Sequence, residues 1–194
     1  MASDVEQALW AFEEAIEGLT GFIRAGAYGL RLAVKRVGDV TAPAGPSAQS
    51  PEMLRLAEAL ESAEDRFSDV VILALGDHLR AFLARALHLP APPPLPETLA
   101  ELEHLPGTPG ALAKVSHWVP LVLQLYRVVL RGGALDRAAL AALGRDDLEI
   151  PYPGGKVKLF RPGDHVTLGE RHLEEAAHAL LEAARAIQLR LLTA

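Results

Sequence analysis

Two Glu-x-x-His segments contain the residue types and spacing that could bind a metal. Glu101 and His104 form the first pair, and Glu175 and His178 form the second. In ferritin-like bundles, a glutamate and a histidine one helical turn apart share a di-iron site when both pairs lie inside long core helices. His104 is followed at once by Leu-Pro-Gly, which ends a helix. We therefore interpret both pairs as surface charge and expect neither a metal site nor a cofactor.

Nucleophilic chemistry has little support in the sequence. The chain contains no cysteine, which excludes thiol nucleophiles, disulfides, zinc-thiolate sites and iron–sulfur clusters. None of the serines lies in a Gly-x-Ser-x-Gly elbow. The glycines at Gly26 and Gly29 lack both a preceding strand and the Gly-Lys-Ser/Thr of a phosphate-binding loop. These observations favour a binding protein over a hydrolase or a nucleotide-binding enzyme.

Basic residues gather in the C-terminal part of the chain and are the candidates for contacting RNA phosphates. The RNA-binding candidates are Arg127, Arg131, Lys156, Lys158 and Arg161. The alternating pattern predicts that Lys156 and Lys158 share the solvent face of a strand, with Val157 and Leu159 on the core side. A solvated strand face is the alternative interpretation of these lysines.

The composition limits the classes of protein to which the chain can belong. Its 194 residues contain 19 Lys plus Arg and 25 Asp plus Glu, a net charge of −6, so the whole surface is not built to coat nucleic acid. Half of the residues are hydrophobic, which indicates a folded core. The N-terminus is acidic where a signal peptide is basic, and no apolar run approaches the ~18 residues that span a bilayer. We expect a soluble cytoplasmic protein that makes no contact with a membrane.

The N-terminal half predicts two long helices. A capping box at Ser3 and Glu6 opens the first, whose apolar stripe runs from Val5 to Ile23; its glycine-containing second half, to about Arg36, is expected to be kinked or packed closely against a neighbour. Residues 41–50 have the composition of a flexible loop. A second helix begins after Ser50 and runs to about His88, and a stiff Pro-rich connector over 89–96 leads to a short helix at 97–104.

The C-terminal half predicts further helices and a small sheet. One helix starts at Thr108, is bent by Pro120 and ends at Gly132 and Gly133; a short helix follows, capped by Asp136. Strands are expected at 148–152, 156–160 and 165–167, and a capping box at Thr167 and Glu170 opens the last helix. The sum is a single domain over 1–194, all-α in the main: an antiparallel bundle of four main helices with a small β-hairpin inserted before the C-terminal helix.

The order of these elements resembles the C-terminal half of HEPN-domain proteins. The segment 125–136 reads Leu-Tyr-Arg-Val-Val-Leu-Arg-Gly-Gly-Ala-Leu-Asp: a helix end and a glycine pair, before a short helix, a hairpin and a terminal helix. The resemblance implies a helical, generally dimeric protein from a family in which many members are metal-independent ribonucleases of toxin–antitoxin and phage-defence systems. The family signature, Arg-x(4–6)-His with a polar residue after the arginine, falls on Tyr126, Arg127 and Arg131.

Both signature residues are therefore replaced, since Tyr126 stands for the arginine and Arg131 for the histidine. A guanidinium is permanently charged and cannot act as the general base that the family's imidazole supplies. The resemblance implies a non-catalytic binding protein, a homodimer or a complex subunit, with RNA as a ligand through Arg127, Arg131 and the hairpin lysines.

Two alternatives remain open at this point. Arg171 and His178 match Arg-x6-His and lie about two turns apart on one face of the final helix, so an active ribonuclease with a divergent site is one of them. The other is a structural adaptor, whose second helix offers an apolar stripe to a protein partner.

Overall fold

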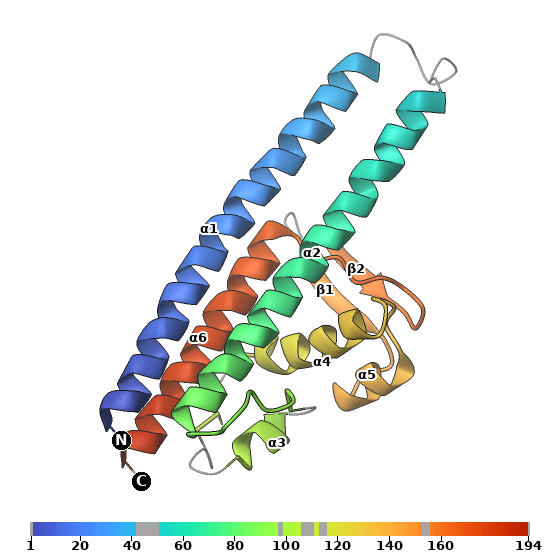
Figure 1. Cartoon of the computed structure of the whole chain (residues 1–194). Helices are drawn as coiled ribbons and strands as arrows, with labels where there is room; N and C mark the ends of the chain where they lie inside the picture. Colours follow the sequence, from blue (N-terminus) through green and yellow to red (C-terminus); the bar gives the residue numbers. More distant parts are fainter. Residues whose placement is uncertain are drawn as a thin grey trace.

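The computed structural model describes residues 2–41, 51–96, 99–105, 111–112, 116–152 and 156–193 (Figure 1). The helices are α1 (Ala2–Thr41), α2 (Pro51–Ala86), α3 (Leu99–Glu103), α4 (Trp118–Leu130), α5 (Arg137–Ala142) and α6 (Glu170–Thr193). The strands are β1 (Leu148–Tyr152) and β2 (Lys156–Phe160), which pair antiparallel. The predicted fold class, a mainly helical bundle with a small hairpin before the C-terminal helix, is confirmed.

The two longest helices, α1 and α2, run antiparallel, and α6 packs along both of them (Figure 1). The apolar stripe predicted for the first helix faces this contact, and its members are buried: Leu9, Phe12, Ile16, Leu19 and Ile23. Both helices continue past the N-terminal end of α6, so their far ends form a two-helix arm (Figure 1). Buried side chains from all six helices and both strands join in one hydrophobic core.

Helix α4 is apolar almost throughout and lies against α2 and α6. It begins at Trp118, so the prediction of a helix from Thr108 bent by Pro120 is wrong: Ser116 and His117 precede the helix, and 106–110 lie outside the described residues. Pro120 sits in the first turn, where a backbone N–H has no partner within the helix and its loss costs nothing. The proline therefore marks the start of α4.

The hairpin has the predicted strands but the opposite faces. Leu148 pairs with Phe160 and Ile150 pairs with Lys158, and the apolar members of these pairs are buried. Val157 and Leu159 lie on the other face and are 58% and 40% exposed, so their expected core position is wrong. Lys158 lies on the same face of β2 as Phe160, at the edge of the core. Its ammonium is 4.8 Å from the centre of the Phe160 ring, a position in which the face of the ring attracts the cation.

The segment between the hairpin and α6 is tied to α2. Thr167 does not cap α6, which begins at Glu170; its hydroxyl donates to Asp65, while the Leu168 N–H donates to Ser68 Oγ over 2.9 Å. His165 makes only an isolated bridge to Ala134, so the expected third strand is absent from this described segment.

Two connecting segments were also predicted. The expected flexible loop 41–50 falls outside the described residues apart from Thr41, which ends α1. The Pro-rich connector 89–96 is described and is non-helical, as expected, and α2 ends just before it at Ala86. Among the described helices, none combines the length and the apolar run needed to cross a bilayer.

Candidate functional site

Tyr126, at the arginine position of the HEPN-like signature, is buried between α4 and α2. Its hydroxyl donates to Asp77 Oδ1 over 2.7 Å and accepts from Arg80 Nη1 over 3.1 Å. Burial raises the pKa of the Tyr126 phenol, and the hydrogen bond to Asp77 raises it further. The phenol therefore stays protonated at neutral pH and serves as a hydrogen-bond donor inside the fold.

A glycine on α2 makes room for this tyrosine. A Cβ atom at Gly76 would lie 2.1 Å from Tyr126 Cδ2 and 2.6 Å from Cε2, well inside van der Waals contact. No pattern in the sequence links Gly76 to Tyr126, because the two residues are brought together only by the packing of α2 against α4. The signature position of the tyrosine is thus part of the core.

Arg127, the polar position of the signature, is held by the Pro-rich connector. Its Nη2 donates to the Leu95 carbonyl over 2.9 Å, and Arg80 Nε on α2 donates to the Pro93 carbonyl over 2.8 Å. Proline-rich backbone has carbonyls with no internal hydrogen-bond partner, and the two guanidinium groups satisfy them. Arg127 therefore has a structural role in holding the Pro-rich connector against α4.

Arg131 stands at the C-terminal end of α4, on the surface. Its Nη1 forms an ion pair with Asp136 Oδ2 over 3.1 Å, and Asp136 Oδ1 accepts from the Ala139 N–H, which confirms Asp136 as the cap of α5. The backbone hydrogen bond from Ala139 and the pairing with Arg131 lower the pKa of Asp136. Tyr126 is buried and Arg131 is exposed, so the two signature positions do not share a site.

A basic hollow lies beside α5. Its volume is about 580 Å³, and its lining includes Arg137, Arg145, Pro162 and the acidic Asp146. Arg137 and Arg145 flank the short helix α5, and the exposed Arg161 immediately precedes Pro162. We define the α5 arginine cluster as Arg131, Arg137, Arg145 and Arg161. The sequence analysis noticed a basic C-terminal part but did not select Arg137 and Arg145, which the cap at Asp136 and the turn at Gly144 bring to one hollow.

Lys158 does not join this cluster. Lys158 lines a separate hollow of about 260 Å³ together with Arg31, Glu64 and Glu170, at the start of α6. Lys156 pairs with Tyr152 in the hairpin register, and its side chain lies outside the described part of the structure. Of the predicted RNA-binding residues, Arg161 precedes Pro162, which lines the α5 hollow, and Arg131 pairs with Asp136, the cap of α5.

Arg171 and His178 both lie on α6 but do not line the same hollow. Arg171 Nε donates to Glu175 Oε1 over 2.8 Å on the surface of α6. The exposed His178 lines a hollow of about 710 Å³ whose lining includes His117, Trp118 and Glu175, the partner of Arg171, but not Arg171 itself. The structure therefore brings His178 together with His117, a residue that the sequence analysis did not consider.

A second polar cluster joins α2 to the segment before α6. His165 Nε2 lies 3.1 Å from Asp69 Oδ2, and His165 Nδ1 lies 3.7 Å from Asp65 Oδ1. A Cβ atom at Gly133, whose φ is +84°, would lie 2.7 Å from His165 Nε2, so the second residue of the glycine pair leaves room for this histidine. This cluster fixes the segment that follows β2 on helix α2.

The Glu-x-x-His pairs do not meet. His104 lies at the end of α3, where its Nδ1 contacts the Ala100 carbonyl, whereas Glu175 and His178 lie on α6. Within the described residues, no group of three or more His, Asp or Glu side chains is placed to hold a metal ion.

Comparisons with known proteins add no family to this picture. No protein-family model matches the chain, and no match was found among curated proteins or solved structures.

Proposed function

We propose that the chain is a non-catalytic helical binding protein that acts as a homodimer or as a complex subunit and contacts RNA phosphates through the α5 arginine cluster. The observation that carries this proposal is the hollow lined by Arg137 and Arg145 beside Arg161. Guanidinium groups bind phosphate oxygens in a bidentate manner, and clustered arginines are typical of phosphate contacts. The resemblance to HEPN-domain proteins supports RNA over other polyanions.

The absence of catalysis is supported by the two signature positions. The hydroxyl of Tyr126 is committed to Asp77 and Arg80 inside the core. Arg131 carries a guanidinium that cannot exchange a proton near neutral pH. Neither residue can supply the acid–base chemistry that the family signature requires.

We predict that the triple variant Arg137→Ala/Arg145→Ala/Arg161→Ala binds short single-stranded RNA at least about 10-fold more weakly than the wild type at low salt. Each lost phosphate contact reduces the number of counterions that binding releases. The negative slope of log affinity against log salt should therefore become shallower by about 2 for three contacts. Fluorescence anisotropy over a salt series measures both quantities.

The matched control changes the same net charge elsewhere. Arg55, Arg66 and Arg85 are exposed on α2, and their triple replacement by alanine should lower affinity much less. Equal losses in the two triple variants would contradict a site at α5. A wild-type protein that fails to bind RNA at low salt would contradict the proposed function itself.

The second candidate function is an active ribonuclease, and the hollow that His117 and His178 share is the observation that favours it. Two imidazoles at one hollow could act as general acid and general base. On the leading proposal, we predict that wild type and His178→Ala leave transfer and ribosomal RNA equally intact in the presence of a metal chelator. Cleavage by the wild type that His178→Ala abolishes on a denaturing gel would establish the ribonuclease instead.

A further inference from the structure

The outer face of α1 is apolar along a part of the helix that nothing in the described structure covers. It presents Trp10 and then, at steps of three or four residues, Gly21, Ala25, Tyr28 and Leu32, all exposed and on the side opposite the buried stripe, with the acidic Glu14 and Glu17 between Trp10 and Gly21. Trp10, Tyr28 and Leu32 are 65%, 59% and 41% exposed. Helix α1 lies at the edge of the molecule in Figure 1, with α2 and α6 packed to the same side of it.

The glycines of this face have no role inside the chain. A Cβ atom at Gly18, Gly21 or Gly29 would meet nothing within 4 Å, whereas one at Gly26 would collide with Phe67 of α2. Glycine weakens a helix interior relative to alanine, so three exposed glycines in one helix call for another explanation. Glycines at a helix surface allow another backbone to approach closely.

From Asp4 to Arg36 the charges on α1 are divided into two opposite halves, and a single further charged residue, Asp39, follows before the helix ends. Between Asp4 and Glu17 every charged residue is acidic, between Arg24 and Arg36 every charged residue is basic, and the stretch between these halves carries no charge. The helix dipole favours this order only within the first and last turns, and the two halves extend far beyond them. The acidic residues are Asp4, Glu6, Glu13, Glu14 and Glu17, and the basic residues are Arg24, Arg31, Lys35 and Arg36.

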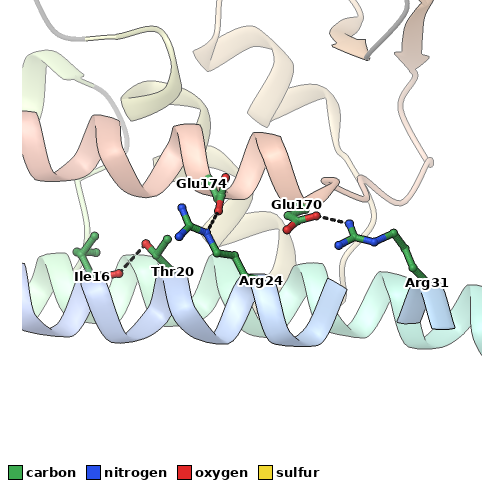
Figure 2. A network of polar contacts seen from close by, with 6 residues as sticks. All are labelled: Ile16, Thr20, Arg24, Arg31, Glu170 and Glu174. Carbon is green, nitrogen blue, oxygen red and sulfur yellow. Dashed lines mark hydrogen bonds and ion pairs between the residues drawn. The ribbon is translucent and has the colours of Figure 1, made fainter. Parts of the chain in front are cut away.

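Some of these charged residues form ion pairs within the chain. Arg24 pairs with Glu174 and Arg31 pairs with Glu170 on α6 (Figure 2), and Glu13 pairs with Arg185. The remaining charges are exposed and make no ion pair with the side chains that the structure describes: Glu6, Glu14, Glu17, Lys35 and Arg36. These five are available to a partner.

We infer that the outer face of α1 binds the same face of a second copy of this chain, with the two helices antiparallel about a two-fold axis near Gly21. Trp10 and Leu32 each lie eleven residues from Gly21, so Trp10 of one copy lies opposite Leu32 of the other. Glu6 and Arg36 each lie fifteen residues from Gly21 and pair in the same way. A two-fold interface repeats each of these contacts twice.

The antiparallel direction follows from the charges. Aligned in parallel, two α1 helices would set acid against acid and base against base, which is unfavourable. Aligned antiparallel, each acidic half faces a basic half over a helix about 60 Å long. At the crossing point, Gly21 faces Gly21 of the second copy, which permits close approach of the two backbones.

This inference rests on the proposed role of the chain as a protein that acts in an assembly, but its test involves no RNA. Because the chain has no cysteine, a single introduced cysteine reports which positions meet their own counterparts. Gly21→Cys should give a disulfide-linked dimer under mild oxidation, since a residue on the axis lies beside itself and a disulfide needs Cα atoms within about 7 Å. Trp10→Cys alone should give no linked dimer, because its two copies lie about 33 Å apart.

Combining Trp10→Cys and Leu32→Cys in one chain should again give a disulfide-linked dimer, because each cysteine then lies opposite the other one in the second copy. Val70→Cys, at an exposed position of α2, is the control for collisional oxidation. Linkage of Trp10→Cys as strong as that of Gly21→Cys would overturn the antiparallel arrangement. A wild-type protein that stays at 20.8 kDa at all concentrations in light scattering would overturn the inference altogether.

Charge-reversal variants distinguish the proposed pairing from nonspecific self-association. Glu6→Arg and Arg36→Glu should each weaken self-association at least about 10-fold, because each places like charges across the interface twice. Mixed together, the two variants should form a heterodimer of near wild-type affinity, since both charge contacts are then again opposite in sign. Absence of this rescue, with both variants shown to be folded by circular dichroism, would contradict the proposed pairing.

Discussion

Phe82→Ala is expected to lower the free energy of unfolding by about 3–5 kcal/mol, the usual cost of removing a buried phenylalanine side chain. Phe82 is 2% exposed on α2, and its ring centroid lies 5.4 Å from that of Phe12 on α1. The two rings join the long helices where the core is continuous, so the surrounding side chains have little room to collapse into the space. Urea unfolding followed by circular dichroism measures the change.

Phe22→Ala is the matched control for this prediction. Phe22 also faces a phenylalanine of α2 at a centroid distance of 5.4 Å, but it is 49% exposed. Because half of its surface stays in water in the folded protein, its loss should cost only about 1 kcal/mol. If the two variants were destabilised equally, the continuous core assigned to this end of the α1–α2 pair would be wrong.

Gly76→Ala is expected to destabilise the protein by about 2 kcal/mol, although alanine is the better helix former by up to about 1 kcal/mol. The new Cβ atom would lie 2.1 Å from the Tyr126 ring, so the ring must shift. The shift strains a packed interior and weakens the hydrogen bonds to Asp77 and Arg80, and such overpacking costs about 1–3 kcal/mol.

Two comparisons isolate the role of Tyr126 in this effect. Gly29→Ala, where a Cβ atom meets nothing within the chain, should raise the free energy of unfolding of the monomer by about 0.5–1 kcal/mol. In a Tyr126→Leu background, Gly76→Ala should cost less than in the wild type, because the two sites are coupled. Equal costs in the two backgrounds would contradict the contact between α2 and the tyrosine.

The fold was largely predictable because its long elements have strong local signals. The stripe from Leu9 to Ile23 matches the helical period, and the Pro-Gly-Gly turn separates two short strand-forming runs. The cap at Asp136 likewise needs only a few neighbouring residues. Each of these signals depends only on residues that lie close together in the sequence.

The errors arose where tertiary packing decides between two local alternatives. Pro120 fits both a bent helix and the first turn of a new one, and alternation along β2 fits either face of the hairpin. The hairpin packs through Phe160 and Ile150, which leaves Val157 in solvent. Which face is buried depends on the helices that cover the hairpin, and these are distant in sequence.

The candidate site was less predictable than the fold for the same reason. Tyr126 and Arg127 were selected from the signature alignment, but their partners Asp77, Arg80 and Leu95 lie on other elements. The bond from Thr167 to Asp65 spans 102 residues, so the expected cap of α6 was lost to a partner that local spacing does not reveal. Exposure of Arg137 and Arg145 at one hollow is likewise a product of the folded structure.

The most direct test of the central claim is incubation of the purified wild-type protein with mixed transfer and ribosomal RNA in the presence of a metal chelator. Mobility shift at low and physiological salt reports binding, and a denaturing gel of the same samples reports cleavage. We predict a shifted complex that weakens with salt and contains intact RNA. RNA fragments that accumulate with time, or RNA that is neither shifted nor cut at low salt, would contradict the account.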